Sequence, residues 1–303
     1  MNYPQTRLQA DTLVRSYITL SIFAALLLTG CVKKEQKVEI PSWEEARNIS
    51  YTEVRRTFKS GVVFNDFGYQ LKPDWRFKIL SDTSVSIFSP KINRFITAHI
   101  QHDHDSIYNF AWAWLRLRKL TKDSIRFQII KVKDNAVLRK ESNIYMTLYS
   151  DNYIRYKLKK DLKDLVKPNA QDSVFIRRQA SLANKDTSQA FSAQEQAIIK
   201  SKNSLLELTK VVPSDPFLPE YDITIKKAYK PFVYSFSVVV DQSGDMLFRH
   251  SRVFIMPEFE DRIKGEIRGI VNGYLSAYLD TQPGKTFGIP HSTIVFVNVR
   301  GVK

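Results

Sequence analysis

The amino-acid sequence predicts an α+β protein, in which a β-rich N-terminal domain, a sandwich or a barrel, precedes a small α+β domain. Short segments of period two recur over residues 51–165, and a different order of strands and one helix follows over residues 221–303. Prolines separate the two patterns. With 43% hydrophobic and 12% aromatic residues, the chain can build such cores without disulfides, since it contains one cysteine.

The first 30 residues have the layout of a secretory leader. Two arginines precede an uncharged segment, residues 16–30, which is short for a spanning helix of about 20 apolar residues. The segment ends in Leu28-Thr29-Gly30-Cys31, which resembles the lipobox of bacterial lipoproteins. The resemblance implies a signal peptide over residues 1–30 and a diacylated Cys31 as the mature N-terminus. The alternative is a buried thiol that follows a signal-anchor helix.

Residues 31–50 are expected to form a tether. The run after the cysteine is charged, and Val32, rather than an aspartate, follows Cys31. This resembles lipoproteins that are exported to the outer membrane, on its periplasmic face or at the cell surface. At the end of the tether, Ser42 and Glu45 fit a capping box and predict a helical turn.

The net charge of +15 would ordinarily indicate nucleic acid as a partner. Behind a lipid anchor, however, the available polyanions are lipid headgroups, acidic glycans and anionic proteins, so we expect no nucleic-acid partner. The basic residues are spread along the chain in pairs such as Arg55-Arg56 and Lys226-Lys227. This distribution favours a generally solvated basic surface over a defined polyanion site.

The domain at residues 51–165 is predicted from short aromatic and β-branched segments that alternate with polar turns. Regular strands of this kind indicate an antiparallel sheet that folds into a sandwich or a barrel. The predicted strands are residues 75–80, 84–88, 94–101, 107–117, 125–132 and 144–150.

The strand predicted to begin at Ile107 carries the candidate ligand-binding residues. Alternation over residues 107–118 would place aromatic rings and two arginines on one face. Such a row could stack sugar rings and bind an anionic glycan, because guanidinium groups pair with carboxylates. In the alternative, the rings form the core of the sheet and the arginines emerge at its rim. The candidates are Tyr108, Trp112, Trp114 and Arg116.

Residues 98–105 contain three of the five histidines beside two aspartates. In an extended segment His102 and His104 share a face, whereas His99 points away. A zinc site usually needs three or four converging ligands, and no second cluster is visible in the sequence. A polar hairpin loop is therefore the interpretation, and neither a metal site nor a cofactor is predicted.

Residues 166–220 are predicted to be a connector with one amphipathic helix. Periodicity is weak over residues 169–187, where one more strand is expected at 173–177. A second capping-box pattern, Ser192 to Glu195, predicts a helix through Lys210. Three prolines between residues 213 and 219 then end this helix and indicate a stiff boundary.

The region 221–303 is predicted to contain strands at residues 222–228, 231–240, 246–255 and 292–299, with a helix at 257–279. In this helix Gly265, Gly269 and Gly273 form a stripe of small residues. Glycines cost a helix about 1 kcal/mol each relative to alanine, so we expect another element to approach this stripe closely.

The order of these elements, with the turn Asp241-Gln242-Ser243-Gly244 and the segment 283–290 before a closing strand, resembles the C-terminal domain of TonB-like proteins. The resemblance implies a small α+β fold that can bind partners by strand addition at its edge. Two departures argue against energy transduction. Members of that family have a membrane-spanning N-terminus and a proline-rich spacer, whereas this chain has a lipobox and a β-rich domain.

No motif in the sequence indicates catalysis. Gly284-Lys285-Thr286 lacks the preceding glycine of a phosphate-binding loop, and no G-x-S-x-G is present. The sequence thus predicts a non-enzymatic interaction or assembly component of the cell envelope, with a protein partner. The first alternative is a glycan-binding outer-membrane lipoprotein, and the second is an envelope hydrolase whose carboxylates only the fold would bring together.

Overall fold

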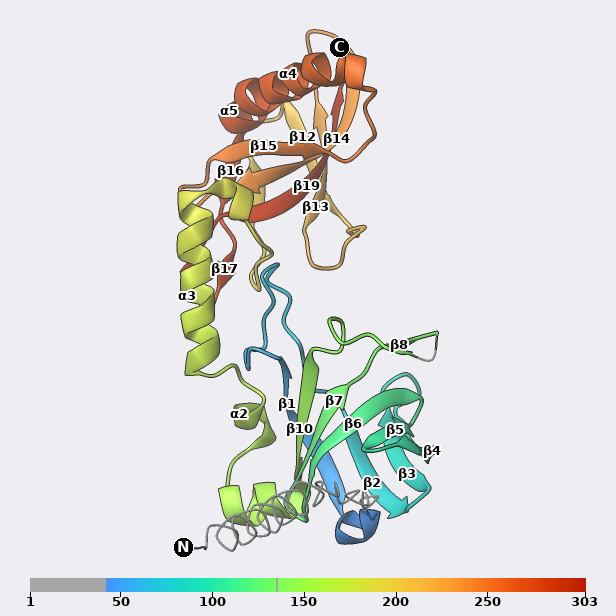
Figure 1. Ribbon diagram of the computed structural model, residues 1–303. Coiled ribbons are helices and arrows are strands. Elements are labelled where there is room, and N and C mark those ends of the chain that lie inside the picture. The colour runs from blue at the N-terminus through green and yellow to red at the C-terminus, as the bar shows by residue number, and fades with distance from the viewer. Residues whose placement is uncertain (1–41, 135) are drawn as a thin grey trace, which may run out of the picture. The chain divides into compact units, whose positions relative to one another are not determined.

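The structure, a computed structural model, describes residues 42–134 and 136–303 (Figure 1). The predicted leader, Cys31 and most of the predicted tether lie outside the described residues. Within the part that is described, no helix combines the length and the apolar character needed to cross a membrane.

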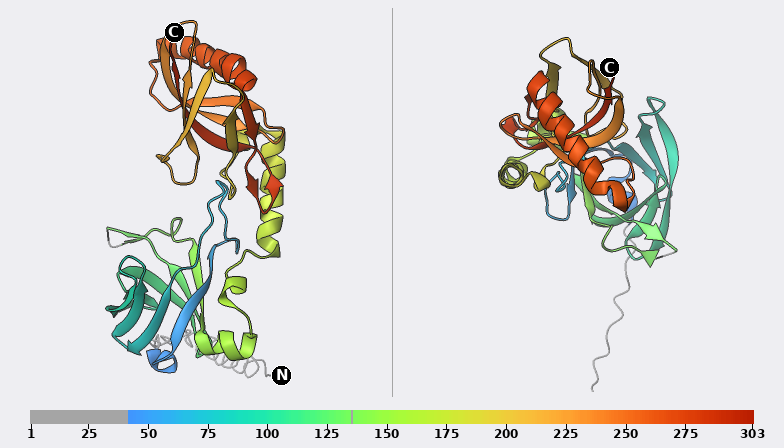
Figure 2. Two further views of the ribbon diagram at one scale, coloured as in Figure 1. Left: turned by 180° about the vertical axis from the view of Figure 1, so that it is seen from behind. Right: turned by 90° about the horizontal axis from the view of Figure 1, so that it is seen from above.

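Eight antiparallel strands close into a barrel, so the barrel alternative of the predicted β-rich domain is confirmed (Figures 1 and 2). Strands β1 to β6 each pair with the next strand in sequence, β10 pairs with β7, and β10 closes the barrel against β1. The strands are β1 (Ser50–Phe58), β2 (Arg76–Ser81), β3 (Ser84–Ser89), β4 (Arg94–His104), β5 (Ile107–Phe110), β6 (Ala113–Leu120), β7 (Ser124–Ile129) and β10 (Ile144–Ser150). The connection from β7 to β10 carries the short strands β8 (Val132–Lys133) and β9 (Ala136–Val137).

Aromatic rings fill the interior of the barrel. Phe110 and Phe127 are fully buried, and the ring of Trp43 lies 5.7 and 6.3 Å from theirs. Trp43 begins a 3-10 turn, Trp43–Ala46, in which the Ser42 hydroxyl accepts a hydrogen bond from the Glu44 N–H. The predicted turn and its Ser42 cap are thereby confirmed, but Glu45 does not complete the predicted capping box. An eight-stranded barrel has just enough interior to be filled by side chains, and here the rings fill it.

The single strand predicted at residues 107–118 was wrong. The chain reverses at Ala111 and Trp112, whose φ angles are 48° and 67°, so that β5 and β6 form a hairpin. Two successive residues at positive φ give the turn that matches the twist of a hairpin. Glycine or asparagine usually occupies such positions, and neither is present here.

After β10, a π-helical segment (Tyr153–Leu158) and α2 (Leu162–Leu165) lead to the long helix α3 (Ala170–Lys185). The strand predicted at residues 173–177 was therefore wrong. Asn169 caps α3 by accepting a hydrogen bond from the Asp172 N–H, and the Asp172 carboxylate accepts one from the Asn169 N–H. This capping box satisfies donors that have no partner within the helix.

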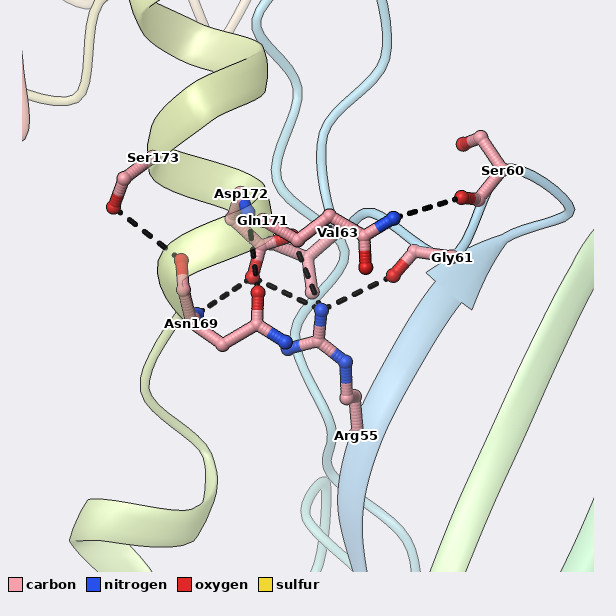
Figure 3. A network of polar contacts seen from close by, with 8 residues as sticks. All are labelled: Arg55, Ser60, Gly61, Val63, Asn169, Gln171, Asp172 and Ser173. Carbon is pink, nitrogen blue, oxygen red and sulfur yellow. Dashed lines mark hydrogen bonds and ion pairs between the residues drawn. The ribbon is translucent and has the colours of Figure 1, made fainter.

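Asp172 also joins α3 to the barrel (Figure 3). Its fully buried carboxylate accepts hydrogen bonds from the Arg55 guanidinium of β1, at 3.0 and 3.1 Å, and from the Val63 N–H at 2.9 Å. The same guanidinium donates to the Gly61 carbonyl oxygen. The network therefore connects the helix start, β1 and the segment that follows β1.

The helix predicted from Ser192 to Lys210 was wrong as well. This stretch forms β11 (Ile198–Ser201) and β12 (Leu206–Val211), which pair with β16 (Leu279–Gln282) and β13 (Glu220–Ile225). The Ser192 hydroxyl donates a hydrogen bond to the Phe67 carbonyl oxygen instead of capping a helix. The three prolines lie in the connection between the paired strands β12 and β13, so they do not mark a boundary.

Five strands form the C-terminal sheet, in the order β12-β13-β19-β14-β15. The central strand β19 (Thr293–Gly301) runs parallel to β13 and antiparallel to β14 (Phe232–Val240). Helix α4 (Glu260–Ile270), a π-helical segment (Val271–Leu275) and α5 (Ser276–Tyr278) cover one face of this sheet (Figure 1). Further short elements are β17 (Lys285–Thr286), β18 (Ile289–Pro290) and two 3-10 turns, Thr187–Gln189 and Pro257–Phe259; β15 spans Met246–Ser251.

The predicted order of elements over residues 221–303 is found, but the role expected for the glycine stripe was wrong. A Cβ atom built at Gly265, Gly269 or Gly273 meets no described atom within 4 Å outside the backbone of its own helix. The core contacts of the helix come instead from Ile267 and Ile270, which pack with the sheet.

Candidate functional site

Strand β15 is an edge of the C-terminal sheet. It pairs with β14 on one side, and no described strand pairs with it on the other. An edge strand of this kind presents unpaired backbone N–H and C=O groups to an incoming chain. The second edge, β12, carries Glu207, which pairs with Lys226, and the exposed Lys210. Charges of this kind discourage pairing with an incoming strand at β12. Strand β15 carries the charged Arg249 as well, so the choice of β15 rests on the exposed hydrophobic residues that follow it.

Directly after β15, the chain exposes a run of large hydrophobic side chains, which we call the apolar segment (residues 253–259). Phe254 is 85% exposed, Val253 61%, Met256 55% and Phe259 45%. Single exposed hydrophobic residues are ordinary, but neighbouring ones in one segment indicate an interaction surface.

Hydrogen bonds hold the apolar segment in a defined conformation. The Ser251 hydroxyl donates to the Val253 carbonyl oxygen at 2.8 Å, and the Phe259 N–H donates to the Met256 carbonyl oxygen at 2.9 Å. Pro257 then occupies the first position of the 3-10 turn that leads into α4, where its missing N–H has no cost. The exposed side chains are therefore presented on an ordered backbone, which lowers the entropy cost of binding.

Arg252 anchors the start of the apolar segment. Its guanidinium donates to the Glu220 carboxylate at 2.6 Å and lies 4.1 Å from the centre of the Phe296 ring. Burial raises the pKa of Glu220, but hydrogen bonds from Ser214, Arg252 and Asn298 outweigh burial and lower that pKa to about 2. The carboxylate is thus ionised at neutral pH and retains the guanidinium as a partner.

Strand β15 carries one cation without an ion-pair partner among the described residues. Arg249 lies within β15, and burial lowers the pKa of its guanidinium. No described carboxylate lies within ion-pair distance of Arg249, whereas Arg262 and Lys264 of α4 pair with Glu266 and Glu260. An edge that offers backbone donors, exposed rings and an unpaired guanidinium is suited to an extended segment with hydrophobic and acidic side chains.

The four residues predicted to bind a ligand do not share one face. Tyr108 is buried in the barrel, where its ring lies 5.2 Å from that of Trp43, whereas Trp112 is 71% exposed in the hairpin turn. Trp114 and Arg116 are half-buried and alternate with the inward-facing Leu115 of β6. The structure therefore brings Trp114 and Arg116 to the outer wall and separates them from Tyr108.

The histidine-rich stretch lies in the β4–β5 hairpin, but its three histidines belong to strand β4, so the predicted loop is limited to the turn that follows His104. A ring nitrogen of His102 lies 3.0 Å from the Asp105 carbonyl oxygen, and His104 contacts the carboxylate of Asp103. Among the residues that the structure describes, no group of three or more His, Cys, Asp or Glu side chains is placed to bind a metal ion.

The apolar segment was missed at the sequence level because residues 246–255 were predicted to be one strand. The available signal was the run Val253-Phe254-Ile255-Met256, which has no alternation and stops at a proline. Cys31 lies outside the described residues. Searches of protein-family models, of curated proteins and of solved structures found no match to this chain.

Proposed function

We propose that this chain is a lipid-anchored, non-catalytic component of the bacterial outer membrane that binds a partner protein at the β15 edge. The observation that supports this most strongly is the ordered apolar segment next to an unpaired edge strand. The rings of Phe254 and Phe259 are exposed, whereas the aromatic residues within the strands of the sheet are buried or half-buried.

The proposed mode of binding is strand addition. An extended segment of the partner pairs with β15 through backbone hydrogen bonds, and its hydrophobic side chains cover Val253 and Phe254. Acidic side chains of the partner lie near Arg249. The order of strand, turn, strand, helix and strand is that of the TonB-like domain named above, which supports a binding role but not energy transduction.

The lipid anchor is the second part of the proposal. It is supported by the leader, in which Leu28-Thr29-Gly30-Cys31 follows a short apolar run. A diacylated N-terminus gives stable membrane attachment, because each buried methylene contributes about 0.8 kcal/mol. Glycan binding by Tyr108, Trp112 and Trp114 acting together is not part of the proposal, since these residues do not share a surface.

An affinity pull-down from detergent-solubilised envelopes tests the proposal. The full lipoprotein, the double variant V253D/F254D and the control V212D serve as baits. Val212 is also an exposed valine, in the connection that follows the other edge strand, β12. We expect one partner protein to be recovered with the wild type and the control and lost with the double variant. Equal recovery with all three baits would refute the proposed site.

A further inference from the structure

The outer wall of the barrel contains a cavity that the proposed function does not use. It measures about 900 Å³ and lies against the outer faces of β6, β7 and β10, beneath the connection that joins β7 to β10. Alternation along β6 directs Arg116 and Arg118 to this outer wall, because Leu115 and Leu117 point into the core. We call this space the cationic cavity.

The connection between β7 and β10 forms the roof of the cationic cavity. One buried side chain joins this roof to the barrel wall. Gln128 of β7 is 7% exposed although it lies on the outer face. Its amide nitrogen donates to the Ser142 carbonyl oxygen of the roof at 2.6 Å, and its amide oxygen accepts from Arg118 Nε at 3.1 Å. The Ser142 hydroxyl in turn accepts from the Lys131 N–H at 3.0 Å. The roof is thereby fixed, and the guanidinium of Arg118 is oriented before any ligand arrives.

The charge of the lining is strongly unbalanced. Five cationic side chains line the cavity, and Asp105 is its one lining carboxylate. None of the five has an ion-pair partner among the described carboxylates. Unpaired cations gathered in a concave site raise the local positive potential and attract anions. The five are Lys59, Arg116, Arg118, Arg139 and Lys140.

We propose that the cationic cavity binds an anionic sugar, a saccharide that carries carboxylate or phosphate groups. The guanidinium groups of Arg116 and Arg118 supply paired donors for such groups. The half-buried Tyr145 lines the same cavity and offers a ring and a hydroxyl group to a sugar. A volume of about 900 Å³ exceeds the needs of a single inorganic anion and falls within the range of small-ligand sites. This inference does not depend on the β15 edge.

Isothermal titration calorimetry on the full chain in detergent tests the inference. The probes are trigalacturonic acid, glucose 6-phosphate, neutral maltotriose and inorganic phosphate. We expect at least one anionic sugar to bind, more weakly as salt is raised, and to bind more tightly than inorganic phosphate, with no heat from maltotriose. No heat from either anionic sugar, or equal affinity for inorganic phosphate, would overturn the inference.

Matched variants locate the binding. The double variant R116Q/R118Q is expected to bind the anionic sugar at least about tenfold more weakly, since charge-assisted hydrogen bonds are lost. The control is R94Q, because Arg94 is an exposed cation of the barrel strand β4 that does not line the cavity. If R116Q/R118Q fails to fold, the double variant R139Q/K140Q removes two exposed cations of the roof without changing any strand residue. An equal loss in the control, or no loss in either double variant, would contradict the proposed site.

Discussion

Replacing Asp172 with asparagine is expected to detach the start of α3 from the barrel. The carboxylate is fully buried and accepts hydrogen bonds from Arg55, Val63 and Asn169. An asparagine keeps the shape but presents an N–H group to one of these donors and leaves the Arg55 guanidinium without its counter-charge. Breaking a buried ion pair costs about 3–5 kcal/mol. We expect about 3 kcal/mol, the lower end, because the Arg55 side chain is 22% exposed and can reach water.

Amide hydrogen exchange at Val63 is the appropriate assay, because its N–H is bonded to Asp172 and reports local opening. A loss of about 3 kcal/mol corresponds to exchange faster by roughly two orders of magnitude when opening is in rapid equilibrium. The control is Asp164→Asn, which removes an exposed pair with Lys167 and should leave the Val63 amide unchanged. Exchange at Val63 in Asp172→Asn that stays within a factor of two or so of the wild type would refute the assigned role.

Three further predictions concern other parts of the chain. Cys31→Ser should abolish labelling by radioactive palmitate and release the protein from the membrane fraction; retained labelling would contradict lipidation at this residue. Burial lowers the pKa of His291 from 6.5 to about 4, so the folded protein favours the neutral imidazole. The free energy of unfolding should therefore be highest above pH 6.5 and fall by about 3 kcal/mol as the pH is lowered toward 4. Urea unfolding should show this fall, and His291→Gln should flatten it. Trp112→Gly should raise stability by about 1 kcal/mol in the same assay, because glycine adopts positive φ without strain; a loss would indicate that the exposed ring makes a stabilising contact.

The barrel was predictable because one face of each strand is buried and the other is solvated. Buried and more exposed side chains alternate along β2, β3, β4, β7 and β10, and the polar turns between these strands carry ordinary turn residues. The β5–β6 turn was not predictable, since Ala111 and Trp112 lack the residue types that signal positive φ. Hydrophobic contacts of Phe110 in the barrel stabilise the hairpin and compensate for the strain.

The connector was predicted least well because long-range pairing decides its structure. Residues 192–210 carry a capping-box pattern and spaced leucines, yet β11 and β12 obtain backbone partners only from β16 and β13. Conversely, α3 depends on the Asn169–Asp172 cap and on Arg55, more than 100 residues away. Sequence periodicity does not report contacts of this kind.

The candidate site was only partly within reach of the sequence. Arg116 was selected for an aromatic face that does not form, and it lines the cationic cavity instead. The roof over that cavity depends on the bond between Gln128 and Ser142, which no local pattern indicates. The apolar segment was visible as a run of hydrophobic residues, but its exposure follows from the end of β15 at Ser251.

Site-specific photo-crosslinking in intact cells tests the central claim, partner binding at the β15 edge, most directly. A photoreactive amino acid replaces His250, an exposed residue of β15, and in a matched control it replaces Glu207, an exposed residue of the opposite edge strand β12. We predict a crosslinked product with a partner envelope protein from position 250 and none from position 207. Crosslinks from position 207 alone, or equal crosslinks from both edges, would contradict the proposal.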